Sequence, residues 1–215
     1  MKPLIQCLRV LFFVLVRFLA LILLGLNVRG RHLLPAKGPA IIVANHNSHL
    51  DTLVLMALFP LRLLRSIRPI AAADYFLKSR FLAWFATNII GVIAIERNIT
   101  GTRADPLQPC YEALKRGEII ILFPEGTRGV PEQLSEFKAG IAHLAERFPA
   151  VPITPIFLYG LGKALPKNEF ILIPFFCDII IGETMRFQLD RGVFMNTLSS
   201  RFRVLADEGG FSVWE

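Results

Sequence analysis

The sequence predicts an α/β fold, in which a mixed, mostly parallel sheet is flanked by helices and preceded by an N-terminal membrane-associated helix. After residue 28, short apolar runs alternate with helical patterns of about 10–15 residues, as they do in sheets covered on both faces. Hydrophobic residues make up 53% of the 215-residue chain and charged residues 19%, which excludes a disordered protein. The net charge of +7 is concentrated at one end, because residues 1–73 carry +8 and residues 74–215 carry −1.

Residues 3–28 form an apolar run long enough to cross a bilayer, which takes about 20 residues. Arg9 and Arg17 interrupt the run, and on a helical wheel they fall within about 80° of Lys2 and Gln6. A polar stripe on a basic, otherwise apolar helix predicts a helix that lies in the membrane interface. A spanning helix is the alternative, and it would place Arg17 near the bilayer centre at a cost of about 2.5–3.5 kcal/mol.

A cleaved signal peptide is a third interpretation of this segment. The residues that follow, 27–34, contain no small-x-small cleavage site and carry positive charges that disfavour export. We therefore expect a protein at the cytoplasmic face of a membrane. Residues 1–28 would form the membrane-associated helix and residues 29–215 a single domain.

The basic side chains of the first third flank long apolar runs instead of interleaving with aromatic residues. This pattern favours an anionic membrane surface as partner and does not favour nucleic acid. The three cysteines share no short spacing, so we expect free thiols in a reducing compartment and no metal-ligand pattern. They are Cys7, Cys110 and Cys177.

The first elements of the predicted sheet follow Pro35 and Gly38. Residues 40–46 are apolar and β-branched, which predicts a buried strand, and 52–59 form a helix pattern that ends before Pro60. The run at 68–74 again predicts a strand. Residues 75–88 are expected to be helical and 89–97 to form the next strand.

The second half continues the alternation. A helix pattern at 104–118 precedes the strong strand pattern at 119–126, and another helix is expected at 137–148. The run at 151–159 contains two prolines, which cannot donate to a β-ladder, so we expect an edge strand or a rigid extended wall. Two later segments complete the chain, an apolar run at 170–184 and a polar helix near 190–207.

Residues 45–51, Asn-His-Asn-Ser-His-Leu-Asp, follow the first predicted strand. Within one helix, His46 and Asp51 would lie about 140° apart and could not meet. With His46 in the turn and Asp51 in the first helical turn they can hydrogen-bond, which gives a general base with a fixed tautomer. Alternatively, Ser48 and Asp51 only cap the helix N-terminus. This segment alone leaves both interpretations open.

Two further polar clusters end predicted strands. In Phe-Pro-Glu-Gly-Thr-Arg, residues 123–128, Gly126 allows close backbone approach and Arg128 offers a planar fork that suits phosphate. Glu125 could accept a substrate hydroxyl or brace Arg128, whereas the alternative is a β-turn with a solvated Glu–Arg pair. Arg97 ends the strand at 89–97, where a solvated rim charge is the alternative.

Taken in order, four motifs resemble the glycerolipid acyltransferase family typified by 1-acyl-glycerol-3-phosphate acyltransferase. That family carries N-H-x-x-x-x-D, G-x-x-x-I-x-R, F-P-E-G-T-R and V-P-[IV]-x-P-[IV]. This sequence supplies them at 45–51, 91–97, 123–128 and 151–156, with a segment similar to F-K-x-G at 137–140. The resemblance covers residues 29–185 and implies the family's fold.

The resemblance also implies site roles. His46 would deprotonate an acceptor hydroxyl so that the hydroxyl attacks an acyl thioester directly, and Asp51 would orient the histidine. The segment between Pro152 and Pro155 would support the acyl-binding side. No metal, no cofactor and no covalent acyl-enzyme are implied. The residues implied to hold the phosphate or other polar head of the acceptor are Arg97, Glu125, Gly126, Thr127 and Arg128.

Two departures from the family pattern concern the acceptor. Phosphate-accepting members often carry K-x-E-L before the second motif, where this chain has Asp-Tyr-Phe-Leu-Lys at 74–78, so the phosphate-facing lysine is missing or replaced by Lys78. Glu96 precedes Arg97 where Asp is common.

The expected acceptor is 1-acyl-sn-glycerol-3-phosphate, a lysolipid of the membrane. A lyso-ornithine lipid or another lysophospholipid is the alternative. The expected donor is acyl-CoA or acyl carrier protein, and both alternatives stay open because the basic first third of the chain would attract either anionic molecule. A lipid hydrolase and a catalytically silent lipid-binding protein are the other functions that stay open.

Overall fold

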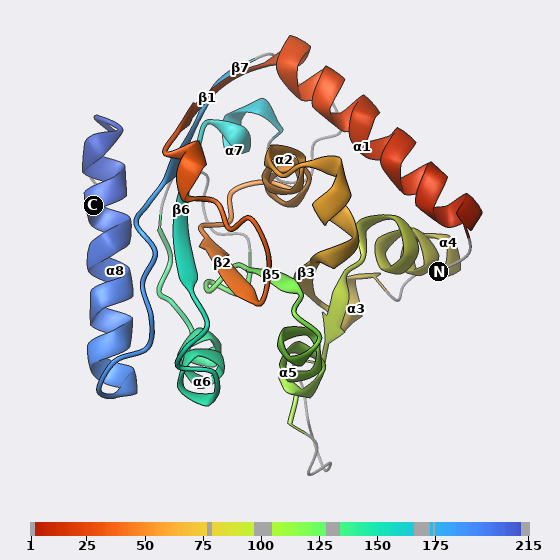
Figure 1. The fold of residues 1–215 in the computed structure, drawn as a ribbon. Helices are drawn as coiled ribbons and strands as arrows, with labels where there is room; N and C mark the ends of the chain where they lie inside the picture. Colours follow the sequence, from red (N-terminus) through yellow and green to blue (C-terminus); the bar gives the residue numbers. More distant parts are fainter. Residues whose placement is uncertain are drawn as a thin grey trace.

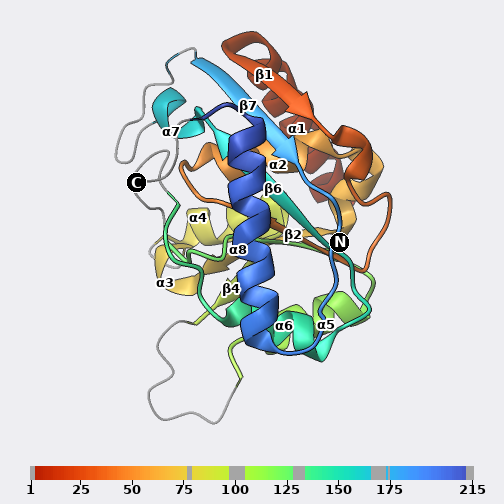
Figure 2. The same cartoon turned by 90° about the vertical axis from the view of Figure 1, so that its left-hand side faces the viewer.

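The structure is a computed structural model that describes residues 3–76, 79–96, 105–127, 134–165, 173 and 175–211. Its described residues form a seven-stranded sheet with helices on both faces (Figures 1 and 2). The strands are β1 (Leu24–Arg29), β2 (Ala40–Ala44), β3 (Ile67–Ala72), β4 (Ile93–Ile95), β5 (Ile119–Leu122), β6 (Ile153–Tyr159) and β7 (Phe175–Ile181). The α-helices are α1 (Pro3–Leu23), α2 (Leu50–Leu58), α3 (Ala73–Phe76), α4 (Arg80–Phe85), α5 (Gln108–Lys115), α6 (Gly140–Arg147), α7 (Leu161–Ala164) and α8 (Arg191–Glu208). Short 3-10 turns lie at η1 (Arg31–Leu33) and η2 (Leu61–Ser66), and a π-helical turn at η3 (Ala86–Ile90).

The sheet has the order β1-β7-β6-β2-β5-β3-β4, and most neighbours are parallel. β6, β2, β5, β3 and β4 all run in one direction, β7 pairs antiparallel with β6, and β1 pairs parallel with β7. The predicted mixed, mostly parallel sheet is therefore confirmed. Because the carboxyl ends of the five parallel strands share one edge, the loops that follow them meet there.

Two hydrophobic cores cover the two faces of the sheet, and β2 shows how the sequence divides between them. Ile42 packs with α1, α2 and α7 on one face, whereas Ile41 and Val43 pack with α5, α6 and α8 on the other. Every residue of β2 is buried, as the continuous apolar run at 40–44 predicts for a strand covered on both sides.

The N-terminal helix ends earlier than the sequence predicts. α1 stops at Leu23, and Leu24–Arg29 form β1, which pairs along its whole length with β7. Pairing with a distant strand overrides the local apolar pattern, which continues unchanged through the boundary. The helix prediction for 24–28 is therefore wrong.

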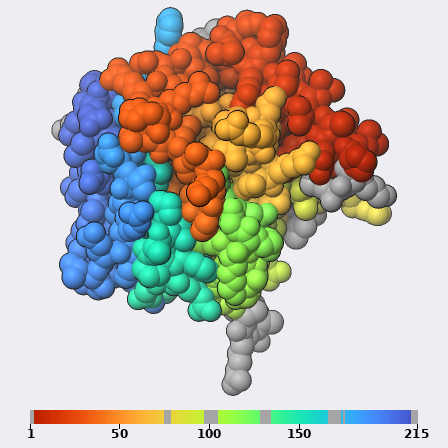
Figure 3. Space-filling view, viewed as in Figure 1, coloured from red at the N-terminus to blue at the C-terminus, as the bar shows by residue number. Residues whose placement is uncertain are grey.

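The arginines of α1 face the protein. Arg9 is 2% exposed and donates to the carbonyls of Ile67 and Ile90, and Arg17 donates to the carbonyl of Ala57 at 2.9 Å. The opposite face of α1 leaves large apolar side chains exposed, and Figure 3 shows the helix, in red, along the outer surface of the molecule. α1 is also long and apolar enough to cross a membrane.

β6 is an interior strand, so the edge-strand prediction for 151–159 is wrong. It pairs with β2 on one side and β7 on the other. Pro155 is tolerated inside the sheet because β7 ends at Ile181, beside it. The carbonyl of Pro155 accepts from Gly182 N–H, and the N–H that proline lacks would point to a place where the β6–β7 ladder is already interrupted. The ladder resumes as a single bridge between Ile153 and Met185.

The predicted helix at 75–88 is divided among α3, α4 and the π-helical turn η3. Gly91, with φ of +84°, ends this turn, and the strand predicted at 89–97 is reduced to Ile93–Ile95. The other predicted elements lie where the sequence places them, with ends shifted by a few residues. Cys7 and Cys110 are free thiols.

Candidate active site

A cavity of about 960 Å³ opens at the edge of the sheet where the parallel strands end. Its size lies within the range of small-molecule sites, about 300–1,000 Å³. Most of the wall is apolar, and the polar side chains His46, Asp74, Glu96, Thr127 and Lys138 also line it. An amphipathic ligand with an apolar body and a polar end therefore matches this lining.

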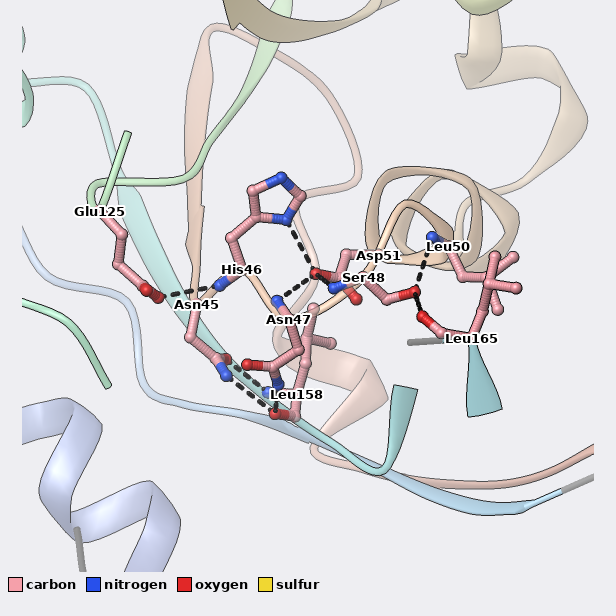
Figure 4. Close-up of polar contacts among 9 residues, drawn as sticks. All are labelled: Asn45, His46, Asn47, Ser48, Leu50, Asp51, Glu125, Leu158 and Leu165. Carbon is pink, nitrogen blue, oxygen red and sulfur yellow. Dashed lines mark hydrogen bonds and ion pairs between the residues drawn. The ribbon is translucent and has the colours of Figure 1, made fainter. Parts of the chain in front are cut away.

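His46 and Asp51 meet at the wall of this cavity. His46 follows β2 in a loop, Asp51 lies in the first turn of α2, and His46 Nδ1 is 2.9 Å from Asp51 Oδ2 (Figure 4). The same oxygen accepts from the backbone N–H groups of Asn47 at 2.7 Å and Ser48 at 2.8 Å. Because Oδ2 already acts as an acceptor, Nδ1 is the donor, which leaves the lone pair on Nε2.

The capping alternative and the His46–Asp51 pairing are both present in the structure. The Ser48 hydroxyl accepts from the N–H of Leu50, the first residue of α2, at 3.3 Å, and Asp51 reaches back to the N–H of Ser48 at 2.8 Å, as in a capping box. The Ser48 hydroxyl also donates to the carbonyl of Leu165 at 3.0 Å. The aspartate shapes the loop and orients His46 at once.

Two buried asparagines fix the loop on β6. Asn45 donates to the carbonyl of Leu158 at 2.8 Å and accepts from Leu158 N at 2.7 Å, so its side chain pairs with β6 as a backbone would. Asn47 donates to the same carbonyl at 2.9 Å. Neither asparagine has a predicted role, although two asparagines that flank a histidine after a buried strand are a recognisable signal of loop anchors.

The segment after β5 supports His46 from the other side. The ring of Phe123 stacks on the imidazole with centroids 4.2 Å apart and an interplanar angle of 22°. Glu125 is buried and accepts from the backbone N–H of His46 at 2.9 Å, and burial raises the pKa of its carboxyl. Glu125 is therefore not part of a solvated pair, and it links the F-P-E-G-T-R motif directly to the N-H-x-x-x-x-D motif.

Gly126 closes the turn after β5 and makes room for a lysine. Its N–H donates to the carbonyl of Phe123 at 3.1 Å, and its φ of +70° favours glycine. A Cβ at this position would lie 2.9 Å from Lys138 Nζ. From the sequence, Lys138 stands out only as part of the F-K-x-G segment. Among the described residues that line the cavity, it is the one that carries a positive charge at neutral pH on a lysine or arginine side chain.

The structure thus brings together five of the eight predicted site residues, which are His46, Asp51, Glu125, Gly126 and Thr127. Gly126 and the exposed Thr127 line the same cavity as His46. The other three, Lys78, Arg97 and Arg128, lie outside the described residues.

The chain is similar in sequence to known acyltransferases. The chain is 34% identical over 145 residues to the chloroplastic 1-acyl-sn-glycerol-3-phosphate acyltransferase of Arabidopsis thaliana, which covers 67% of this chain and 38% of that protein. It is 33% identical over 144 residues to 1-acyl-sn-glycerol-3-phosphate acyltransferase alpha of Homo sapiens, covering 66% of this chain and 48% of that one. The chain therefore spans less than half the length of these two relatives.

A solved structure and a family model extend the comparison. The fold is similar to the crystal structure of the 1-acyl-sn-glycerophosphate acyltransferase PlsC from Thermotoga maritima, with a TM-score of 0.73 and 20% identity, covering 100% of this chain and 86% of that chain. The family model described as Acyltransferase matches residues 25–159, which include the whole His46–Asp51 loop, β5 and β6. The chain belongs to the acyltransferase family.

Proposed function

We propose that this chain is a membrane-associated O-acyltransferase that moves a fatty acyl group from an acyl thioester to the hydroxyl of 1-acyl-sn-glycerol-3-phosphate, giving phosphatidic acid. The observation that carries the proposal is the hydrogen bond from His46 Nδ1 to Asp51 Oδ2 at the wall of a large, mostly apolar cavity. A histidine fixed in this tautomer presents a basic Nε2, which is what deprotonation of a hydroxyl requires.

The proposed step is a direct transfer. His46 Nε2 takes the proton of the acceptor hydroxyl while the oxygen attacks the thioester carbonyl and forms the new ester bond. The carbon–sulfur bond breaks, and the leaving thiolate takes the proton from the imidazolium, which Asp51 stabilises. Neither a covalent acyl-enzyme nor a redox step is needed.

The acceptor's phosphate would be held by cationic side chains around the cavity. Lys138 lines it beside Gly126, and we propose that Arg97 and Arg128 join it, as their motifs imply, with Lys78 in place of the family's phosphate-facing lysine. Glu125 would act as a positioning residue, because it accepts from the backbone of His46. The acyl chain would lie along the apolar lining.

Membrane association follows from α1, which we propose lies in the plane of the interface ahead of the acyltransferase domain. Its outward face carries exposed leucine, isoleucine, valine and phenylalanine side chains, while Arg9 and Arg17 hold its inner face on the protein. A helix held along its length in this way would have to detach in order to span the bilayer. The excess of basic residues in the first 73 positions favours the anionic cytoplasmic leaflet.

The test is acyl transfer in mixed micelles with radiolabelled acyl-CoA or acyl carrier protein as donor. Lysophosphatidate, lyso-ornithine lipid and a lysophospholipid without a free phosphate are offered separately, and products are resolved chromatographically. Phosphatidic acid from lysophosphatidate is the expected product. Transfer only to another acceptor would overturn the substrate and keep the chemistry, whereas free fatty acid without an acylated product would identify a hydrolase.

A further inference from the structure

Helix α4 exposes two aromatic side chains next to the apolar face of α1. Phe81 is 72% exposed and Trp84 is 42% exposed. On the same helix, Phe85 packs edge-to-face on Phe12 of α1, with ring centroids 5.2 Å apart and planes at 88°. The ring of Phe81 lies in turn 6.4 Å from that of Phe85 in a stacked arrangement. The aromatic surface of α4 is therefore continuous with α1, beside which α4 lies in Figure 1.

Exposed arginines border this surface, whereas the exposed acids Asp74 and Glu96 line the cavity to which Leu82 of α4 also contributes. Arg80 begins α4 and is exposed, and Arg62 and Arg65 are exposed on η2, which also contacts α1. Among the described residues 3–73, Asp51 is the one acid, and it is buried. An apolar surface bordered by arginines is complementary to a bilayer that contains anionic lipid, where the headgroups meet the arginines and the acyl region meets the apolar side chains.

The same short helix also forms part of the cavity wall. Leu82 lines the cavity, between the exposed Phe81 and the next exposed aromatic residue, Trp84. Ile90 and Val92, which follow α4 along the chain, line it as well. α4 thus connects the outer surface to the cavity that contains His46.

We propose that α4 is a second membrane-contacting element, in which Phe81 and Trp84 enter the interface of an anionic bilayer beside α1. Tryptophan and phenylalanine suit this position, since aromatic rings are enriched at membrane–water interfaces. The contact holds the α4 side of the cavity against the bilayer, so that a lysolipid enters laterally without crossing water. This inference rests on the membrane association proposed above for α1.

The sequence provides a direct probe, because Trp84 and Trp214 are the two tryptophans of the chain. In a Trp214→Phe variant of the full chain, the emission of Trp84 is recorded with vesicles of phosphatidylcholine and phosphatidylglycerol, with and without bromine on the acyl chains near the headgroup. We expect a blue shift on binding and quenching by the brominated lipid. A matched control places the reporter on α8, across the sheet, as Val204→Trp in a chain with both native tryptophans replaced by Phe, and it should not be quenched.

The possible outcomes distinguish the contact between α4 and the membrane from the membrane association of the chain as a whole. If the protein floats with the vesicles and Trp84 is not quenched, α4 is not in the membrane and the inference is wrong. If the emission of Trp84 is already blue-shifted without lipid and returns to the red on dilution, a second copy covers α4, which also overturns it. Failure to float at all would contradict the membrane association itself, and none of these readouts depends on acyl transfer.

Removing the two aromatic side chains gives a second measurement. Phe81→Ser combined with Trp84→Ser should weaken vesicle binding about tenfold or more, because two large apolar side chains no longer leave water. Acyl transfer to lysophosphatidate embedded in vesicles should fall with binding, whereas transfer to a short-chain, monomeric lysophosphatidate should stay near wild type. Leu189→Ser, at an exposed apolar position outside α1 and α4, is the matched control and should change neither vesicle binding nor acyl transfer to either form of lysophosphatidate.

Discussion

The guanidinium of Arg9 donates a 2.8 Å hydrogen bond to the carbonyl of Ile90, 81 residues further along the chain. Ile90 lines the cavity. The next residue is Gly91, and a Cβ at this position would lie only 2.9 Å from both Arg9 Nη2 and Arg68 Nη1, so the glycine leaves room for the two arginines. Arg68 is itself paired with Glu118. The helix that carries the exposed apolar face is thereby joined to the cavity wall by a buried cation.

Arg9→Ala should lower the free energy of unfolding by about 2–4 kcal/mol. The change removes hydrogen bonds from a charged donor to two carbonyls and leaves a void beneath α1. Chemical denaturation in detergent measures the difference, with Arg62→Ala as the matched control at an exposed arginine. Equal stability of the two variants would show that the contact between α1 and the cavity wall contributes nothing to the fold.

Asp51→Asn should lower kcat about 100-fold while leaving the acceptor KM near wild type. An asparagine oxygen can still accept from Asn47 and Ser48, so the loop keeps its shape, but the amide cannot stabilise an imidazolium. Asp51→Ala should in addition lower the unfolding free energy by about 1–3 kcal/mol, because both N–H groups lose their acceptor. Steady-state kinetics and thermal melting of the two variants separate the contributions, and a kcat for Asp51→Asn near wild type would exclude the proposed stabilisation of the imidazolium by Asp51.

Glu125→Gln should become more stable relative to wild type as pH rises. Burial raises the pKa of the Glu125 carboxyl, so the folded chain retains a proton that the unfolded chain releases near pH 4.5. The wild type therefore loses stability from about pH 4.5 up through the raised pKa, whereas glutamine does not titrate. The difference in melting temperature between variant and wild type should grow across this range, and a difference that is constant with pH would contradict the prediction.

Lys138→Ala should raise the KM for lysophosphatidate about tenfold and leave the KM for a monoacylglycerol unchanged. The expected loss is that of one charge-assisted hydrogen bond to the phosphate, about 1.5 kcal/mol. Lys138→Arg should restore part of the affinity, and Lys37→Ala, at an exposed lysine, should have no effect. An equal rise in KM for both acceptors would show that Lys138 maintains the structure of the site and does not contact the phosphate.

Much of the fold can be predicted from local patterns, and the errors occur where distant partners decide. β2 and β5 are continuous apolar runs whose class follows from composition, and the alternation with helices predicts a parallel sheet. β1 does not follow from local pattern, because Leu24–Arg29 continues an apolar helical run and becomes a strand only by pairing with β7. The two prolines in 151–159 predict an edge strand, but the missing N–H of Pro155 is tolerated inside the sheet because β7 has ended beside it.

The site shows the same division. The pairing of His46 with Asp51 could be anticipated from their spacing across a turn, and the structure confirms the contact. The stacking of Phe123 and the inward orientation of Arg9 could not, because each depends on a segment far away in sequence. A stripe of arginines on an apolar helix does not reveal whether it faces water, headgroups or the protein.

The central claim is that His46 is the base that activates the acceptor hydroxyl. The test measures phosphatidic acid formation from lysophosphatidate with acyl-CoA or acyl carrier protein as donor. It compares wild type, His46→Ala and, as a control, His143→Ala, because His143 is exposed on α6 and is not among the residues that line the cavity. We predict that His46→Ala lowers turnover about 100-fold or more at unchanged melting temperature, and that His143→Ala matches wild type. A His46→Ala enzyme that retains turnover within a few-fold of wild type would contradict the account.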